Sequence, residues 1–85
     1  MKNTASWYTY MVRCSDHSLY TGIAKDLDKR IAAHNDGSGA KYTRSRRPVR
    51  LVYKEEHPNR SEASKREYQI KKMGSVAKKA LILSL

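Results

Sequence analysis

Aromatic, β-branched and polar residues alternate along the first third of the chain and predict a β-hairpin. The segments 7–14 (WYTYMVRC) and 18–24 (SLYTGIA) both have the composition of strands. A polar turn that contains Asp16 and His17 separates them. We therefore expect two antiparallel strands at the start of the domain.

The length of that turn decides where two tyrosines point. If the turn has an odd number of residues, such as 15–17, Tyr10 pairs opposite Gly22 and Tyr20 lies diagonally on the same face. An even-numbered turn places the two tyrosines on opposite faces. The pattern of residues leaves both registers open.

The hydrophobic period changes after the hairpin, and the next segment predicts a helix that runs to about His34. Asp26 can cap this helix, Leu27 and Ile31 are four residues apart, and Arg30 and His34 have the same spacing. Arg30 and His34 therefore border the apolar stripe, close to whatever the stripe packs against.

Residues 35–48 (NDGSGAKYTRSRRP) contain glycines and a proline without any periodicity, so we interpret them as a loop. Residues 49–54 (VRLVYK) alternate well enough for a third strand, with Val49, Leu51 and Tyr53 on one side.

A second helix is predicted from a cap at Ser61 through Met73, with Gly74 at the position of a left-handed C-cap. Its apolar stripe follows the helical spacing and consists of Ala63, Glu67, Ile70 and Met73. The stripe places the carboxylate of Glu67 among buried positions, where a charge needs a compensating interaction.

A last helix is expected after a cap at Ser75, with Val76, Ala80 and Leu83 on its inner face. The order is then ββαβαα, and three strands of this size most simply form one sheet flanked by helices. The predicted class is α+β, in one domain that covers residues 1–85 with its core at about 7–83.

Size and charge narrow the functional classes. A chain of 85 residues holds one core at most, and 18 Lys and Arg against 8 Asp and Glu leave a net charge of +10. A net positive charge of this size attracts polyanions, so nucleic acid is the first candidate partner. We expect no membrane association, because no apolar run reaches the roughly 18 residues of a spanning helix.

Cysteine usage and the N-terminal sequence indicate a cytoplasmic protein. Cys14 is the single cysteine and suits a reducing compartment, and the first residues (MKNTASWY) lack the apolar region of a secretory signal.

Phosphodiester cleavage needs an activated nucleophile, relief of charge on the transition state and stabilisation of the leaving oxygen. A tyrosine near a cation can activate water, an arginine can bind phosphate oxygens in a bidentate manner, and one carboxylate can hold a largely hydrated Mg²⁺. Tyr20, Arg30 and Glu67 are the candidates for these three tasks.

These residues lie in two short motifs that resemble the GIY-YIG nuclease superfamily, and in particular its small stand-alone UPF0213 family. The first motif is Tyr8-Thr9-Tyr10 and the second is Tyr20-Thr21-Gly22. The run from the second motif to Arg30 has a spacing similar to that of the superfamily. The resemblance extends from about Trp7 to Leu83.

The resemblance implies a three-stranded antiparallel sheet with helices around it and an endonuclease that acts on DNA with a single divalent ion, Mg²⁺ or Mn²⁺. It implies that Tyr20 is the general base or its equivalent, with Tyr10 beside it. Arg30 matches the arginine that binds the phosphate, and Glu67 matches the sole metal-binding carboxylate. His34 falls where relatives place a residue near the scissile phosphate.

Further cations are candidates for contact with the nucleic-acid backbone. Lys25 follows the second motif, and the expected loop adds a basic group around one aromatic residue: Lys41, Tyr42, Arg44, Arg46 and Arg47. This composition suits phosphate contacts together with base stacking. The same residues can also be a solvated run of charge.

Each candidate has a structural alternative. Tyr10 and Tyr20 can be ordinary hairpin aromatics, and the stem of Arg30 can simply cover the core. Glu67 can form a half-buried ion pair, and His34 can interact with the dipole at the end of its helix.

Two nucleic-acid functions therefore stay open at this point, beside a third in which the basic face docks an acidic protein partner. One is a metal-dependent endonuclease with low sequence specificity, whose choice of site comes from DNA structure or from a protein partner. The other is a non-catalytic nucleic-acid binding module on the same scaffold.

Overall fold

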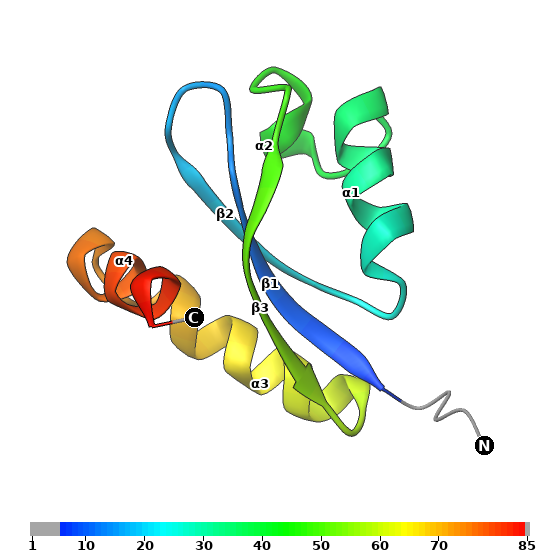
Figure 1. The fold of residues 1–85 in the computed structure, drawn as a ribbon. Helices are drawn as coiled ribbons and strands as arrows, with labels where there is room; N and C mark the ends of the chain where they lie inside the picture. Colours follow the sequence, from blue (N-terminus) through cyan, green and yellow to red (C-terminus); the bar gives the residue numbers. More distant parts are fainter. Residues whose placement is uncertain (1–5, 85) are drawn as a thin grey trace.

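A three-stranded antiparallel sheet forms the centre of the protein, which we describe from a computed structural model for residues 6–84. Residues 1–5 and 85 of the expected domain lie outside the described part. The sheet has the order β2-β1-β3 (Figure 1), and the elements are β1 (Trp7–Arg13), β2 (Leu19–Ala24), α1 (Leu27–Asp36), α2 (Lys41–Arg44), β3 (Arg50–His57), α3 (Arg60–Lys71) and α4 (Ser75–Leu83). The α+β class and the antiparallel sheet are confirmed.

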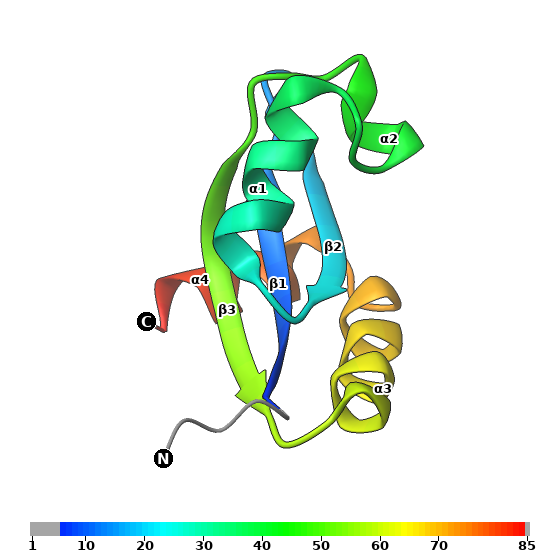
Figure 2. The same cartoon turned by 90° about the vertical axis from the view of Figure 1, so that its right-hand side faces the viewer.

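Two hydrophobic clusters cover the two faces of the sheet. Tyr10 and Val12 of β1 point to the face of α1, where Leu27 and Ile31 pack against them. Met11 points to the opposite face and packs with Ile70 of α3. Figures 1 and 2 show the resulting layers, with α1 and α2 on one side of the sheet and α3 and α4 on the other.

The hairpin has the register that an odd-numbered turn predicts. Tyr10 lies opposite Gly22, and Tyr20 lies opposite Val12, two residues further along the same face. Residues 14–18 form the turn, which the Cys14 amide closes by donating to the carbonyl of Ser18 at 2.9 Å. Both tyrosines therefore face α1.

Strand β3 differs from its predicted arrangement because it contains a β-bulge. The register against β1 shifts between Met11 and Val12, whose partners are Tyr53 and Leu51. The extra residue reverses the alternation, so Val49 joins the cluster under α1 and Tyr53 joins the cluster under α3. The expectation that Val49, Leu51 and Tyr53 share one side is wrong.

The expected loop 35–48 is shorter than predicted, since α1 continues to Asp36 and α2 forms within it. Asp26 caps α1 as predicted, by accepting from the Lys29 amide. Gly37 ends the helix with a φ of 92°, a conformation that favours glycine. Helix α2 has 4 residues, too few to show a hydrophobic period in the sequence. With α2 included, the order of elements is ββααβαα.

Helix α3 begins before the predicted cap at Ser61. Asn59 is the N-cap, and its side chain accepts from the amide of Glu62. The helix ends at Lys71 with Lys72 as its C-cap, rather than at a left-handed Gly74. Gly74 instead takes the N-cap position of α4 that was predicted for Ser75, with a φ of −72°.

The inner face of α4 is also displaced from its prediction. Val76 and Leu83 are exposed at 82% and 83%, whereas Leu81 and Ile82 pack against the cluster around Met11. Only a narrow side of α4 packs against the rest of the protein, and apolar residues lie on several sides of this helix. The sequence therefore does not identify the side that is buried. No helix of the described chain has the length and hydropathy needed to cross a bilayer.

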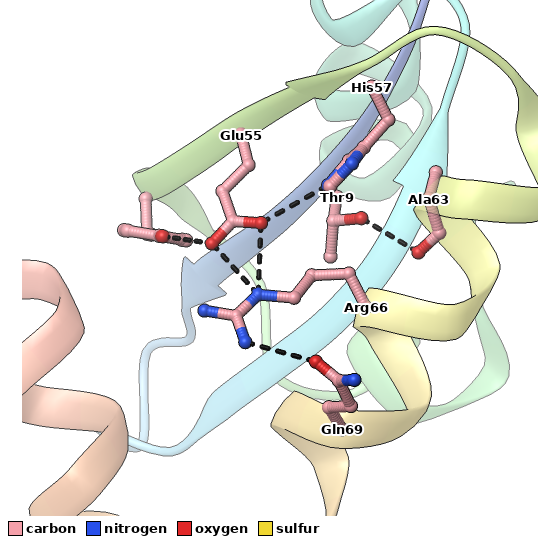
Figure 3. Close-up of polar contacts among 7 residues, drawn as sticks. Thr9, Glu55, His57, Ala63, Arg66 and Gln69 are labelled. Atoms are coloured by element: carbon pink, nitrogen blue, oxygen red, sulfur yellow. Dashed lines mark hydrogen bonds and ion pairs between the residues drawn. The ribbon is translucent and has the colours of Figure 1, made fainter.

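A polar network fixes α3 against the sheet (Figure 3). The Arg66 Nε donates to both carboxylate oxygens of Glu55 on β3 at 3.0 Å, and the Thr9 hydroxyl donates to the carbonyl of Ala63 at 2.8 Å. Glu55 also accepts from the Tyr53 hydroxyl. These contacts fix the rotation of α3 about its axis, and with it the direction of the neighbouring Glu67.

Candidate active site

Tyr10 lies at the centre of a polar cluster between the sheet and α1. Its side chain is fully buried, and its hydroxyl oxygen is 2.7 Å from Nε2 of His34. The Arg30 Nε donates to the same hydroxyl at 3.4 Å. Gly22 makes room for the ring, because a Cβ at that position would lie 2.7 Å from the Tyr10 hydroxyl oxygen.

The hydrogen bonds of this cluster form one directed chain. The Thr43 hydroxyl donates to the carbonyl of Ala40 at 3.0 Å, so Nδ1 of His34 donates to Thr43 at 2.8 Å. Nε2 of His34 is then an acceptor, and the Tyr10 hydroxyl donates to it. In this assignment the shorter contacts of the chain are satisfied, and the 3.5 Å approach of the Ala40 amide to Nδ1 gives way to the 2.8 Å contact with Thr43.

Burial and the nearby guanidinium set the protonation states of the cluster. Burial raises the pKa of Tyr10, although Arg30 partly opposes that effect, so the phenol is protonated at neutral pH. Burial, and then the charge of Arg30, lower the pKa of His34, so its imidazole is neutral. The hydrogen bond that Arg30 donates to Tyr10 raises the pKa of Arg30, which stays charged.

Tyr20 is the half-buried tyrosine of the pair and lies in a column of aromatic rings. The Tyr20 ring meets the His34 ring edge-on, with 5.3 Å between the ring centroids, and stacks on the Tyr42 ring, with 5.9 Å between the centroids. The guanidinium of Arg46 lies 4.0 Å from the centre of the Tyr42 ring. The Tyr20 phenol is therefore fixed in orientation by its neighbours, yet keeps part of its surface exposed.

Glu67 approaches the cluster from α3. Its side chain is 22% exposed, and its charge contributes to the raised pKa of Tyr10, after the larger effect of burial. The predicted stripe is confirmed, since Ala63 and Ile70 of the same helix face are fully buried. The Lys71 Nζ lies 3.1 Å from Oε2 of Glu67, an ion pair within the helix.

A comparison with known families agrees with this geometry. A family model described as "GIY-YIG catalytic domain" matches residues 6–79. The chain belongs to the GIY-YIG nuclease superfamily. Its two motifs lie on the paired strands β1 and β2, which carry Tyr10 and Tyr20 respectively.

Curated relatives place the chain in the UPF0213 family of that superfamily. It is 59% identical to the UPF0213 protein SSP2268 of Staphylococcus saprophyticus, over 88% of this chain and 92% of the relative. It is 53% identical to the UPF0213 protein DP2720 of Desulfotalea psychrophila, over 91% of this chain and 71% of the relative. Membership of a nuclease superfamily implies a nucleic-acid substrate.

A solved structure supports the same assignment. The solution NMR structure of the UPF0213 protein BH0048 from Bacillus halodurans aligns with a TM-score of 0.59 and 43% identity. The alignment covers 91% of this chain and 82% of that one. The three-stranded sheet with flanking helices is thus the UPF0213 fold.

The predicted cations of this GIY-YIG domain fall into two groups. Lys25 lies with Arg30 in the lining of a shallow depression beside α1, and Lys41 and Arg44 are exposed on α2. Arg46 is instead paired with Asp16 at 3.0 Å, and Arg47 donates to the carbonyl of Arg44 at 2.9 Å. Arg46 and Arg47 therefore have protein partners that order the α2 segment.

Sequence reasoning missed the residues that hold His34 in place. Thr43 has no periodic pattern around it, so nothing in the sequence connects it to His34. Gly39 carries a signal that could have been used, because a glycine in a polar turn often marks a close approach. A Cβ at Gly39 would lie 2.6 Å from Nδ1 of His34.

Proposed function

We propose that this protein is a divalent-metal-dependent endonuclease that hydrolyses phosphodiester bonds of DNA with low sequence specificity. The observation that carries the proposal is one connected cluster, in which the Tyr10 hydroxyl contacts both His34 and the Arg30 guanidinium and Tyr20 packs on His34. The carboxylate of Glu67 contributes to the raised pKa of the same Tyr10 phenol.

In this proposal Tyr20 and Arg30 meet the substrate. Tyr20 is the tyrosine with exposed surface, so in this proposal its deprotonated side-chain oxygen accepts the proton of the attacking water. The Arg30 guanidinium keeps donors free beyond its Nε contact with Tyr10, and these bind the phosphate oxygens as negative charge develops.

Tyr10 and His34 act through their neighbours, since both are fully buried. Tyr10 accepts from Arg30 and donates to His34, which orients the guanidinium toward the exposed side of the site. His34 also supports Tyr20 by ring contact. Both are positioning residues in the proposed mechanism.

The residues around Glu67 fit a single, largely hydrated divalent ion. No group of three or more His, Cys, Asp or Glu side chains that could hold a metal ion occurs within residues 6–84, so Glu67 would be the single protein ligand of such an ion. Mg²⁺ in nucleases commonly keeps several water ligands and uses one or two carboxylates. Glu67 would hold the ion, which supplies charge stabilisation for the leaving oxygen.

One carboxylate and one base make one active site, so we propose that each encounter cuts one strand. The site has no attached recognition element within the described residues, and a partner or the structure of the DNA would direct it. The buried free thiol of Cys14 suits a reducing compartment, which favours activity in the cytoplasm.

A plasmid-nicking assay with Mg²⁺ or Mn²⁺ tests the proposal. We expect Tyr20→Phe, Arg30→Ala and Glu67→Gln each to reduce nicking by about a hundredfold or more. The matched controls Tyr68→Phe, Arg50→Ala and Glu56→Gln remove the same groups from exposed positions and should retain activity.

Equal nicking by all variants would trace the activity to a contaminating nuclease and would overturn the proposal. Salt-dependent binding of DNA without cleavage by any divalent ion would instead indicate the second function, a binding module that keeps the nuclease scaffold.

A further inference from the structure

A shallow depression lies beside the exposed surface of Tyr20 and joins four elements of the fold. Its lining consists of Leu19, Tyr20 and Thr21 from β2, Tyr42 from α2, Lys71 from α3 and Lys78 from α4. Helix α4 thereby comes next to the candidate active site, although its sequence showed no sign of a functional role.

Two of the lining residues are cations that come from different helices. Lys78 is half-buried, and no ion pair involves it within residues 6–84. Helix α4 contains no acidic residue that could balance it. Lys71 is paired with Glu67, but an ammonium has three donors and can bind a second anion at the same time.

Thr21, one of the lining residues, carries an unsatisfied polar group beneath the surface. The Thr21 hydroxyl is buried and has no hydrogen-bond partner, which distinguishes it from the other buried side-chain polar atoms of residues 6–84. Leaving such a group unpaired is costly.

The cations of α2 and of the segment after it are absent from the lining of this depression. Arg46 is held by Asp16 and by the carbonyl of Tyr42, and Arg47 by carbonyls at Arg44 and Asn35. The cations among the lining residues of the depression are thus the two lysines from α3 and α4.

We propose that Lys71 and Lys78 bind a backbone phosphate of the substrate strand next to the phosphate that is cut. The strand would cross Arg30 and Tyr20 and continue over the depression. The ligand class is a nucleic-acid phosphodiester, bound through charge and independently of base sequence. This inference rests on the proposed function and adds a subsite to it.

The test measures binding in the absence of cleavage. Fluorescence anisotropy of a labelled single-stranded oligonucleotide, in EDTA, gives the affinity at a series of KCl concentrations. Lys78→Gln and Lys71→Gln are compared with Lys79→Gln and Lys72→Gln, which remove the same charge from the adjacent, exposed positions.

We expect each depression variant to lower the slope of log K against log salt by about 0.7, the value for one phosphate contact on a single strand. The affinity should fall severalfold more than in the adjacent controls. Lys78→Arg should restore binding, and urea unfolding should show that all variants are folded.

Equal losses in Lys78→Gln and Lys79→Gln would overturn the subsite, because both would then report net charge alone. The result is separate from that of the nicking assay: a protein that never cuts DNA can still show the Lys78 effect, and an active nuclease can lack it. In an active protein, Lys78→Gln should raise the substrate concentration needed for half-maximal nicking and leave the maximal rate nearly unchanged.

Discussion

The hydroxyl of Tyr10 donates to Nε2 of His34 over 2.7 Å, inside a region where neither side chain is exposed. This contact joins β1, which carries the first motif, to α1. It leaves a lone pair of the Tyr10 hydroxyl oxygen to accept the hydrogen bond from Arg30. The two residues therefore connect the stability of the fold with the orientation of the guanidinium that we propose binds phosphate.

Removing the Tyr10 hydroxyl should affect both properties. We expect Tyr10→Phe to lower the free energy of unfolding by about 1–3 kcal/mol, because Nε2 of His34 is left without its donor in a buried site. Urea unfolding measures this loss. Tyr68→Phe, on the exposed face of α3, is the control and should change stability by less than about 0.5 kcal/mol.

The neutral state of His34 predicts how stability depends on pH. Burial lowers the folded-state pKa of His34, so at mildly acidic pH the unfolded chain binds a proton that the folded chain does not. Stability is therefore complete above the unfolded pKa of about 6.5 and declines as the pH falls below it.

Urea unfolding between about pH 5 and 7.5 tests this window, where the carboxylates of the unfolded chain are already ionised. We expect His34→Gln to be less stable at every pH but to lose the decline that the wild type shows. His17→Asn is the control, since Asn tolerates the positive φ of 69° at that turn. An unchanged decline in His34→Gln would show that another group causes it.

The close approach of Tyr10 to Gly22 predicts that the glycine of the second motif cannot be replaced. In Gly22→Ala the new methyl group would lie within 2.9 Å of the Tyr10 ring, which is held by His34. We expect a loss of about 1–3 kcal/mol from the strain and a marked loss of nicking. Gly74→Ala meets no atom within 4 Å and should cost about 1 kcal/mol or less.

Most of the architecture could be predicted from sequence because it depends on local patterns. The hairpin, the Asp26 cap and the stripe that contains Glu67 follow from alternation, capping chemistry and helical spacing. The Asn59 cap carried the same kind of signal, since Glu62 follows it by three residues, and the prediction at Ser61 overlooked it.

Features set by packing could not be predicted in the same way. The bulge in β3 depends on the register against Met11, and the covered side of α4 depends on where Leu81 and Ile82 meet the sheet. The partners of Arg46 and Arg47 depend on the path of the chain around α2. Charge alone had suggested that both arginines were available to nucleic acid.

The displaced face of α4 gives a direct contrast between adjacent residues. Ile82→Ala should destabilise the protein by about 1–3 kcal/mol, since Ile82 packs against the cluster around Met11. Leu83→Ala should change stability by less than about 0.5 kcal/mol, because Leu83 is 83% exposed. Thermal and urea unfolding measure the stability of both variants. A larger loss in Leu83→Ala than in Ile82→Ala would contradict this packing of α4.

The anchor of α3 predicts a link between Glu55 and the position of Glu67. Burial alone would raise the pKa of Glu55, but hydrogen bonds from Tyr53 and Arg66 lower it below its ordinary value. The carboxylate therefore stabilises the fold above the unfolded pKa of about 4.3, and this contribution is lost as the pH falls.

Glu55→Gln should cost about 1–3 kcal/mol at neutral pH, because Arg66 loses its charged partner in a half-buried site. The decline in stability below about pH 4.5 should become shallower in this variant. Glu56→Gln, adjacent on β3 and exposed, is the control for both measurements.

The same variant tests whether the anchor positions the site. If α3 needs the Glu55–Arg66 contact to direct Glu67, Glu55→Gln should require more Mg²⁺ for half-maximal nicking at a temperature where it is fully folded. Glu56→Gln should require the same Mg²⁺ as the wild type. A normal Mg²⁺ requirement in folded Glu55→Gln would limit the network of Figure 3 to a role in stability.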